Sequence, residues 1–467
     1  MIVRLALRSL ATRPLRSAVL ACGFGLGISV MANLLGIGDV ILEQAQSPHL
    51  AGGGDLQIGS ETGRVDNTRF LISSVLGSPP LAGRALAVAP SARARLYLVK
   101  DGGVVTVEAR GGIPSMDRAL GDPEITDVAA WVDTEDDRRF MAPDPGDLLR
   151  AMDRFHPVPD RPAREESWAE WLYFNGRAGG TRFYVTFVVG PEDAPGTRRA
   201  GVRLQLERDG EIVGYSDGAS IDAAALLDTA PDLSIAASSV RLAGTTYHIA
   251  LDLPAEDGGA DRVTGELLLE ATPGRSFPPF TIHGAGGWQT GYVVPVLSGT
   301  LRGQLTVAGE RLRLSGGTGY HDHNWGFWRD VTWRWGQVAG DGLSIVYGRV
   351  HPPADAADAT RLPGFLVLLG PDGPLGTSTR VTIDEIDDPE TGRPRSIRVR
   401  ARGAVDLTME MAVDSAVVTR MDRGPFAPSQ RTMDFLQMRG AYQVSGRVGE
   451  RAIDFVAQGS AETFRGR

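Results

Sequence analysis

Short segments in which apolar and polar residues alternate recur along most of the chain. In 202–207, Val, Leu and Leu alternate with Arg, Gln and Glu, and Asp209–Gly210 then supplies a hairpin turn. Further strand-like segments are 183–189, 245–253, 263–271, 301–307, 311–314, 343–350, 365–369, 397–399, 407–413, 442–448 and 453–457. Short strands at this spacing are typical of sandwiches and barrels. The pattern predicts a mainly β protein with two β domains, 168–300 and 301–467.

The first 45 residues follow a different pattern. Four arginines between positions 4 and 16 precede an uncharged stretch, 17–38, and Asp39 and Glu43 follow it. A helix needs about 20 mostly apolar residues to cross a bilayer. Because arginines mark the cytoplasmic side, we expect a single-pass anchor over 1–45 in a bacterial cytoplasmic membrane. The N-terminus would then be cytoplasmic and the bulk of the chain outside the cytoplasm. A cleaved signal peptide is the alternative.

Two segments separate this predicted anchor from the strands. Residues 46–125 would form a small external segment. Residues 126–167, rich in Asp, Glu, Arg and Pro, read as a connector with one short helix at 147–153.

Composition narrows the possible functions. The 467 residues carry a net charge of −9 and no block of basic residues, which argues against nucleic acid as a partner. Cys22 is the single cysteine, so an internal disulfide and a cysteine-based zinc site are excluded. No Gly-x-Ser-x-Gly elbow supports serine hydrolase chemistry.

Two aromatic clusters stand out in a chain with 7% aromatic residues. One lies between positions 320 and 337, and the other in 168–176. We expect them to line a pocket for a hydrophobic molecule at or near the junction of the two β domains; the alternative is that they form core. The residues expected to contact the ligand are Trp168, Trp171, Tyr173, Asn175, His321, His323, Asn324, Trp325, Trp333 and Trp335.

The segment 320–325 contains the candidate chemistry. In an extended strand, Tyr320, Asp322 and Asn324 would share one face, while His321, His323 and Trp325 would share the other. An acid among large aromatic side chains loses hydration, so its pKa rises and it becomes a proton donor at neutral pH. Aromatic faces can stabilise a developing carbocation. This combination suits protonation of a carbon–carbon double bond, followed by water addition or cyclisation.

Other interpretations of the same residues remain open. Asp322 could be structural, pairing with Arg329 or Arg334. His321 and His323 could hold a metal with a third ligand such as His351, but two histidines at this spacing more often have structural roles. We therefore predict no metal and no cofactor.

The octapeptide Gly-Tyr-His-Asp-His-Asn-Trp-Gly at 319–326, with Glu-Trp-Leu-Tyr-Phe-Asn-Gly at 170–176 upstream, resembles the carotenoid 1,2-hydratase/AttH-like family of tandem lipocalin-like proteins. The resemblance covers about 130–467 and implies two lipocalin-like β-barrel or sandwich domains. It also implies Asp322 as the acid that protonates a terminal double bond, with Tyr320 as its partner. The hydratases carry a His-x-Trp pair shortly before the octapeptide, and neither residue is found around Tyr292.

A second resemblance concerns the N-terminus. Residues 5–17, together with 54–59 and 111–114, are similar to the start of FtsX/MacB-type ABC-transporter permeases. Two functions follow from the two resemblances. One is a cofactor-independent hydratase, isomerase or cyclase acting on a terpenoid, carotenoid or other polyene. The other is a non-catalytic lipid-binding accessory of an ABC transporter, with transporter subunits as partners.

Overall fold

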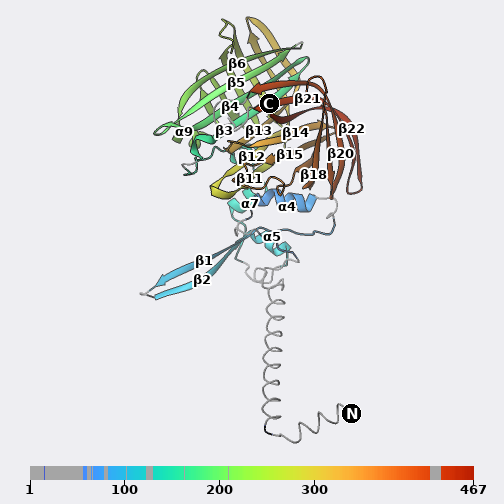
Figure 1. Cartoon of the computed structure of the whole chain (residues 1–467). Coiled ribbons are helices and arrows are strands. Elements are labelled where there is room, and N and C mark those ends of the chain that lie inside the picture. The colour runs from blue at the N-terminus through green and yellow to red at the C-terminus, as the bar shows by residue number, and fades with distance from the viewer. Residues whose placement is uncertain are drawn as a thin grey trace, which may run out of the picture. The chain divides into compact units, whose positions relative to one another are not determined.

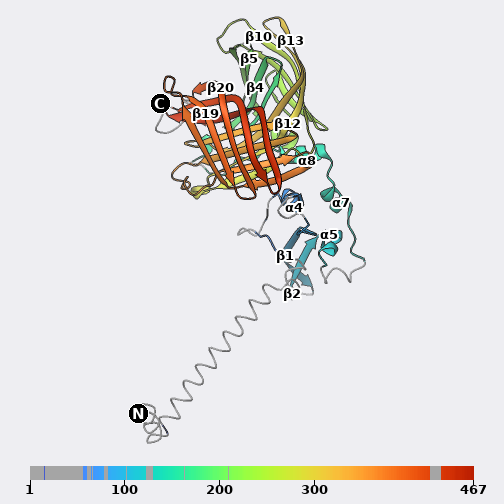
Figure 2. The same ribbon diagram turned by 90° about the vertical axis from the view of Figure 1, so that its right-hand side faces the viewer.

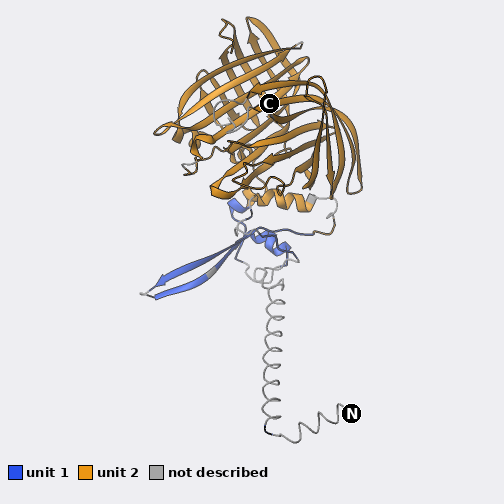
Figure 3. Cartoon of the chain, viewed as in Figure 1, with its two compact units in different colours: residues 1–66, 86–137 blue, residues 67–85, 138–467 orange. Residues whose placement is uncertain are grey.

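The computed structural model describes residues 15, 56–59, 65, 67–77, 83–100, 103–121, 130–161, 164–208, 210–420 and 433–466. These residues are mainly in strands, as the alternating pattern predicted. The chain divides into two compact units, coloured separately in Figure 3. Unit 1 comprises 1–66 and 86–137, and unit 2 comprises 67–85 and 138–467.

Unit 1 contains an antiparallel hairpin of β1 (Ser91–Lys100) and β2 (Gly103–Gly112), followed by α5 (Pro114–Ala119). Helix α7 (Glu135–Met141) spans the boundary between the units. In the ranges given above, no helix is both long enough and apolar enough to cross a membrane. The predicted anchor at 1–45 lies outside the described residues, apart from Leu15. The anchor and the permease-like segment therefore remain predictions.

Unit 2 begins with helices and continues as strands. Helices α4 (Thr68–Gly77) and α8 (Pro145–Met152) precede the strands, and α8 covers most of the short helix expected in the connector. Asp144 caps α8, because its side chain accepts hydrogen bonds from the backbone N–H groups of Gly146 and Asp147. The short elements η2 (Glu165–Ser167), α9 (Ala223–Thr229) and η3 (Ala285–Gly287) lie between later strands or at their ends.

The first sheet of unit 2 has eleven strands in the order β6-β5-β4-β3-β13-β12-β10-β9-β8-β7, with β11 paired to β12 (Figure 1). They are β3 (Trp168–Ala178), β4 (Thr181–Ala194), β5 (Thr197–Arg208), β6 (Glu211–Asp222), β7 (Leu233–Ile235), β8 (Ser238–Ala243), β9 (Thr246–Pro254), β10 (Arg262–Ala271), β11 (Phe277–His283), β12 (Gln289–Val307) and β13 (Glu310–Phe327). The turn between β12 and β13 uses Ala308 and Gly309 at positive φ, the geometry that two-residue hairpins favour.

The second sheet has nine strands in the order β17-β16-β15-β14-β22-β21-β20-β19-β18, and Figure 2 shows several of them side by side. They are β14 (Thr332–Gly340), β15 (Leu343–His351), β16 (Phe365–Gly370), β17 (Gly373–Ser378), β18 (Arg380–Asp387), β19 (Pro394–Arg402), β20 (Val405–Arg420), β21 (Met433–Val448) and β22 (Arg451–Gly466). In each sheet the first strand pairs with the last, β3 with β13 and β14 with β22. The two sheets thus repeat one plan.

The sheets divide at a different point from the predicted domain boundary. Residue 300 falls inside β12, and β13 pairs with β3 from Thr318 to Phe327. The chain passes from the first sheet to the second between Phe327 and Thr332. The prediction failed here because alternation reveals strands, whereas the assignment of a strand to a sheet depends on its distant partners.

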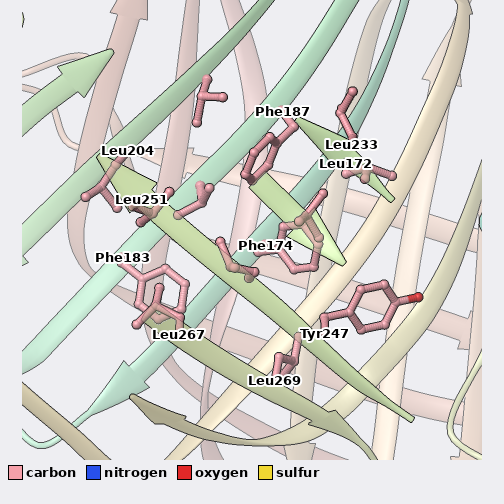
Figure 4. Close-up of a cluster of buried hydrophobic side chains, with 14 of the residues drawn as sticks. Leu172, Phe174, Phe183, Phe187, Leu204, Leu233, Tyr247, Leu251, Leu267 and Leu269 are labelled. Atoms are coloured by element: carbon pink, nitrogen blue, oxygen red, sulfur yellow. The ribbon is translucent and has the colours of Figure 1, made fainter. Parts of the chain in front are cut away.

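Three apolar cores hold the strands together. The first sheet curls until Tyr215 of β6 bridges to Ala255, just after β9. Side chains from both halves of that sheet meet inside the curl, and Figure 4 shows Phe174, Phe187 and Leu251 among them. A second core fills the second sheet. A third, rich in tryptophan, joins residues of both sheets and of the segment between them. The functional residues lie around this third core.

Candidate functional site

A cavity of about 300 Å³ lies between the two sheets of unit 2. Eight of its 21 lining residues are aromatic. Trp171, Trp328 and Trp333 contact one another, with ring centroids 4.5 to 6.2 Å apart. The remaining lining residues include Tyr173, Tyr292, Asp322, Asn324, Trp335, Phe365, Phe435, Gln437 and Glu462. The cavity thus places two carboxyl groups among aromatic rings, and Arg203 and Arg334 also line it.

Asp322 enters this cavity from β13. Its Oδ2 accepts a hydrogen bond from the Tyr320 hydroxyl at 2.8 Å, and its Oδ1 accepts one from the Asn324 side chain at 2.6 Å. Burial raises the pKa of Asp322 well above its ordinary value, and the nearby charge of Glu462 raises it further. The two hydrogen bonds oppose this rise in pKa without cancelling it. Burial and the charge of Glu462 therefore both favour the neutral, protonated form of Asp322.

Glu462 reaches the same cavity from β22 of the second sheet. Its carboxyl accepts hydrogen bonds from Trp333 Nε1 at 3.2 Å and from Gln437 Nε2 at 3.5 Å. Burial raises the pKa of Glu462, while hydrogen bonds from Trp333, Gln437 and Tyr173 hold the pKa down. Burial thus favours the protonated form of both carboxyls, and the charge of Glu462 adds to this effect at Asp322.

The opposite face of β13 holds a buried charge network. His323 lies between Asp153 Oδ1, at 2.8 Å from its Nδ1, and Glu170 Oε1, at 2.9 Å from its Nε2. Burial alone would lower the pKa of His323, but hydrogen bonds to these two carboxylates raise it to about 9. His321 Nε2 lies 2.9 Å from Asp153 Oδ2. The network therefore consists of two carboxylates held by an imidazolium.

The same network contains a possible cation site. His156, Glu170 and His323 each offer one ligand atom, and these atoms lie within 4.8 Å of one another. However, His156 Nδ1 and His323 Nε2 already lie at hydrogen-bond distance, 2.7 and 2.9 Å, from Glu170 Oε1. The three side chains thus satisfy one another without a metal, and the predicted absence of a metal remains a prediction.

The structure separates the predicted site residues into two groups. Alternation along 320–325 is as predicted, because Asp322 and Asn324 face the cavity and both histidines face the buried network. The residues predicted to contact ligand that do line the cavity are Trp171, Tyr173, Asn324, Trp333 and Trp335.

The other predicted contacts lie elsewhere. Asn175 lines a second, more polar hollow of about 250 Å³. Tyr320, predicted as the partner of Asp322 and not as a ligand contact, also lines this hollow while its hydroxyl donates to Asp322. Trp168 is fully buried against Phe327, and Trp325 stacks on His156 on the far side of β13. His321 and His323 belong to the charge network. The expectation that these residues form one binding surface was too broad, because half of each strand faces away from the cavity.

Sequence reasoning missed Glu462, Gln437 and Tyr292. In β22, Glu462 lies between two buried residues, Ala461 and Thr463, whose side chains point to the opposite face of the strand. Nothing local to 433–466 indicated that β22 lies across the cavity from β13.

The chain matches no protein-family model and no curated protein sequence. Among solved structures it is similar to one described as AttH from Nitrosomonas europaea, with 15% identity and a TM-score of 0.42 over 66% of this chain and 99% of that one. Kievitone hydratase from Nectria haematococca gives 14% identity and a TM-score of 0.43 over 66% and 93%. CghA with Sch210972 gives 11% identity and a TM-score of 0.40 over 63% and 88%. Similarity at this level leaves the activity to be inferred from the site itself.

Proposed function

We propose that unit 2 binds a hydrophobic small molecule in the cavity between its sheets, and that Asp322 protonates a carbon–carbon double bond of that molecule. One observation carries the proposal. A carboxyl whose pKa is raised by burial lines a cavity that also contains four tryptophans. Such an acid is a proton donor at neutral pH, and the faces of the rings stabilise positive charge that develops on carbon.

The carboxyl pair accounts for every proton in a hydration. Asp322 transfers its proton to one carbon of the double bond, and the π electrons form the new C–H bond. Water then bonds to the other carbon while the Glu462 carboxylate takes one of the water protons. Return of that proton from Glu462 to Asp322 restores the starting state, so the net change is addition of one water. If Glu462 instead removes a proton from a neighbouring carbon, the product is an isomer. If the π electrons of a second double bond first form a C–C bond to the cationic carbon, and the new cation then loses a proton to Glu462, the product is a cyclised compound.

The volume of the cavity limits the size of the ligand that it can hold. A volume of about 300 Å³ is at the small end of ligand pockets. It suits a compact terpenoid or polyene, or the end of a longer one such as a carotenoid. We further propose that the reaction takes place outside the cytoplasm on a membrane-anchored protein. The support for this location is the arginine-flanked apolar stretch at 17–38.

The test is mass spectrometry of organic extracts from the full-length protein purified from its native host. Wild type would be compared with Asp322→Asn and Glu462→Gln, and with Asp454→Asn as a control at an exposed position of β22. We expect wild type and the control to carry a species one water heavier than that in the Asp322 variant, or an isomer of it. If all four proteins carry the same lipid in similar amounts, the protein is a non-catalytic lipid carrier, as the permease-like N-terminus would suit.

A further inference from the structure

Tyr292 is a buried residue whose hydroxyl group takes no part in the reaction proposed above. It lies on β12, it is 8% exposed, and its ring stacks on Phe277 and Phe365 at 5.7 and 5.4 Å. The side chain lines the aromatic cavity. Among the residues that the structure describes, none is a hydrogen-bond partner for its hydroxyl.

Four other buried tyrosines of unit 2 have hydrogen-bond partners. Tyr247 donates to Asp153 at 3.0 Å, Tyr320 donates to Asp322 at 2.8 Å, and Tyr347 bonds to Tyr442 at 2.8 Å. Leaving a buried hydroxyl without a partner is destabilising. An unpaired hydroxyl at a cavity wall is what a site built for a polar ligand atom presents before that atom binds.

We propose that the Tyr292 hydroxyl anchors a carbonyl oxygen of the substrate, so that the substrate is an oxygenated compound and not a pure hydrocarbon. This inference rests on the proposed function and identifies the substrate class of the same site. Tyr292 and Asp322 line one cavity, so an oxygen held by Tyr292 positions the neighbouring carbons of the ligand against the acid.

The state of the nearby groups favours a carbonyl over a hydroxyl. Burial, and secondarily the charge of Asp322, raises the pKa of Tyr292 well above its ordinary value, so the phenol stays protonated and donates. A carbonyl oxygen only accepts hydrogen bonds, so it matches this donor. A ligand hydroxyl would bring a second donor to the same hydroxyl group.

The test compares two probes that differ in one group, methyl β-naphthyl ketone and β-isopropenylnaphthalene, in which a methylene replaces the carbonyl oxygen. Both would be titrated into the full-length chain in lipid nanodiscs, with empty nanodiscs as the blank. Tryptophan fluorescence reports binding because four tryptophans line the cavity. We expect wild type to bind the ketone roughly 3–10-fold more tightly than the alkene, as one hydrogen bond allows.

Tyr292→Phe keeps the ring stacking and removes the donor. We expect this variant to lose the preference for the ketone over the alkene, because only ketone binding is weakened. On binding to wild type, the carbonyl infrared band of the ketone should shift downward, and in the variant this shift should be absent. Tyr215→Phe, in the core of the first sheet, is the matched control. Equal loss of both probes in Tyr292→Phe, no preference in wild type, or no binding of either probe would each overturn the inference. Because the readout is binding, it can succeed or fail whether or not Asp322→Asn changes the extracted product.

Discussion

Asp322 on β13 and Glu462 on β22 face one aromatic cavity from two different sheets. Neither strand pairs with the other, so the two acids meet only because the sheets pack together. In a space with little water, the charge of one carboxyl directly affects the proton affinity of the other.

Neutralising Glu462 should therefore change the titration of Asp322. In Glu462→Gln we expect the pKa of Asp322 to fall relative to wild type, because a buried negative neighbour is gone, yet to stay above its ordinary value, because burial persists. Carbon-13 NMR of the carboxyl groups across a pH titration measures this. Glu450→Gln, at an exposed position before β22, should leave the pKa of Asp322 unchanged. An Asp322 titration identical in wild type and Glu462→Gln would show that the two carboxyls are not coupled.

The acid at the site should also reduce stability as pH rises. A carboxyl whose folded pKa is above its unfolded value, here near 3.8, binds more protons folded than unfolded. The contribution of Asp322 to the free energy of unfolding is intact at or below pH 3.8, and it is lost progressively at higher pH. We expect Asp322→Asn to be more stable than wild type by on the order of 1 kcal/mol or more at pH 8, with a smaller difference at pH 4.5. Denaturant unfolding at both pH values measures the difference, and Asp454→Asn should show none. A loss of stability in Asp322→Asn that is larger at pH 8 would contradict this account.

The buried network has a different pH dependence. His323 has a folded pKa of about 9 against an ordinary value of 6.5, so its contribution is complete below 6.5 and is lost as the pH rises through 9. We expect wild type to lose on the order of 2–3 kcal/mol of stability between pH 6.5 and pH 9 from this group. His323→Gln should remove that dependence. At pH 7 it should also destabilise the protein by about 3–5 kcal/mol, since Asp153 and Glu170 then lose their shared cation.

The control for this prediction is His248→Gln, since the His248 side chain is 42% exposed beside Glu266. Unfolding curves of this variant should follow wild type at every pH. If His323→Gln retained the full loss between pH 6.5 and 9, the imidazolium would not be its cause.

Gly291 should tolerate no side chain. It lies at the cavity wall, and a Cβ there would come within 2.5 Å of the Trp325 ring and 2.7 Å of the Phe280 carbonyl oxygen. We expect Gly291→Ala to lower the free energy of unfolding by about 1–3 kcal/mol. Gly180→Ala, where nothing lies within 4 Å of the added carbon, should change stability by less than about 0.5 kcal/mol. Similar unfolding midpoints for the two variants would contradict the close packing.

The features that could be predicted from the sequence are those that depend on residues close together in the chain. Alternation identified the strands, and the same alternation assigned Asp322 and His323 to opposite faces of β13. The environment of Asp322 was also predictable, because its motif contains large aromatic residues within a few positions. These features are encoded within about ten residues of one another.

The rest of the site depends on contacts between distant segments. Glu462, Gln437 and Tyr292 reach the cavity through the packing of one sheet on the other. The division between the sheets was predicted too early for the same reason, since β13 belongs with β3, which precedes it by more than a hundred residues. Trp325 was predicted to bind ligand because aromatic residues suit both a core and a pocket, and only its contacts show which role it has.

The alternation along β13 also limits how this protein can diverge. Asp322 and His323 are adjacent in the chain, but the environment of Asp322 favours a neutral side chain and that of His323 favours a charged one. Gain or loss of a single residue in 318–325 would slip the strand by one position and exchange the two faces. The acid would then enter the charge network, and the imidazolium would enter the tryptophan cavity. Descendants of this gene can therefore accumulate substitutions along β13, but insertions and deletions should be purged from it and confined to turns such as 308–309.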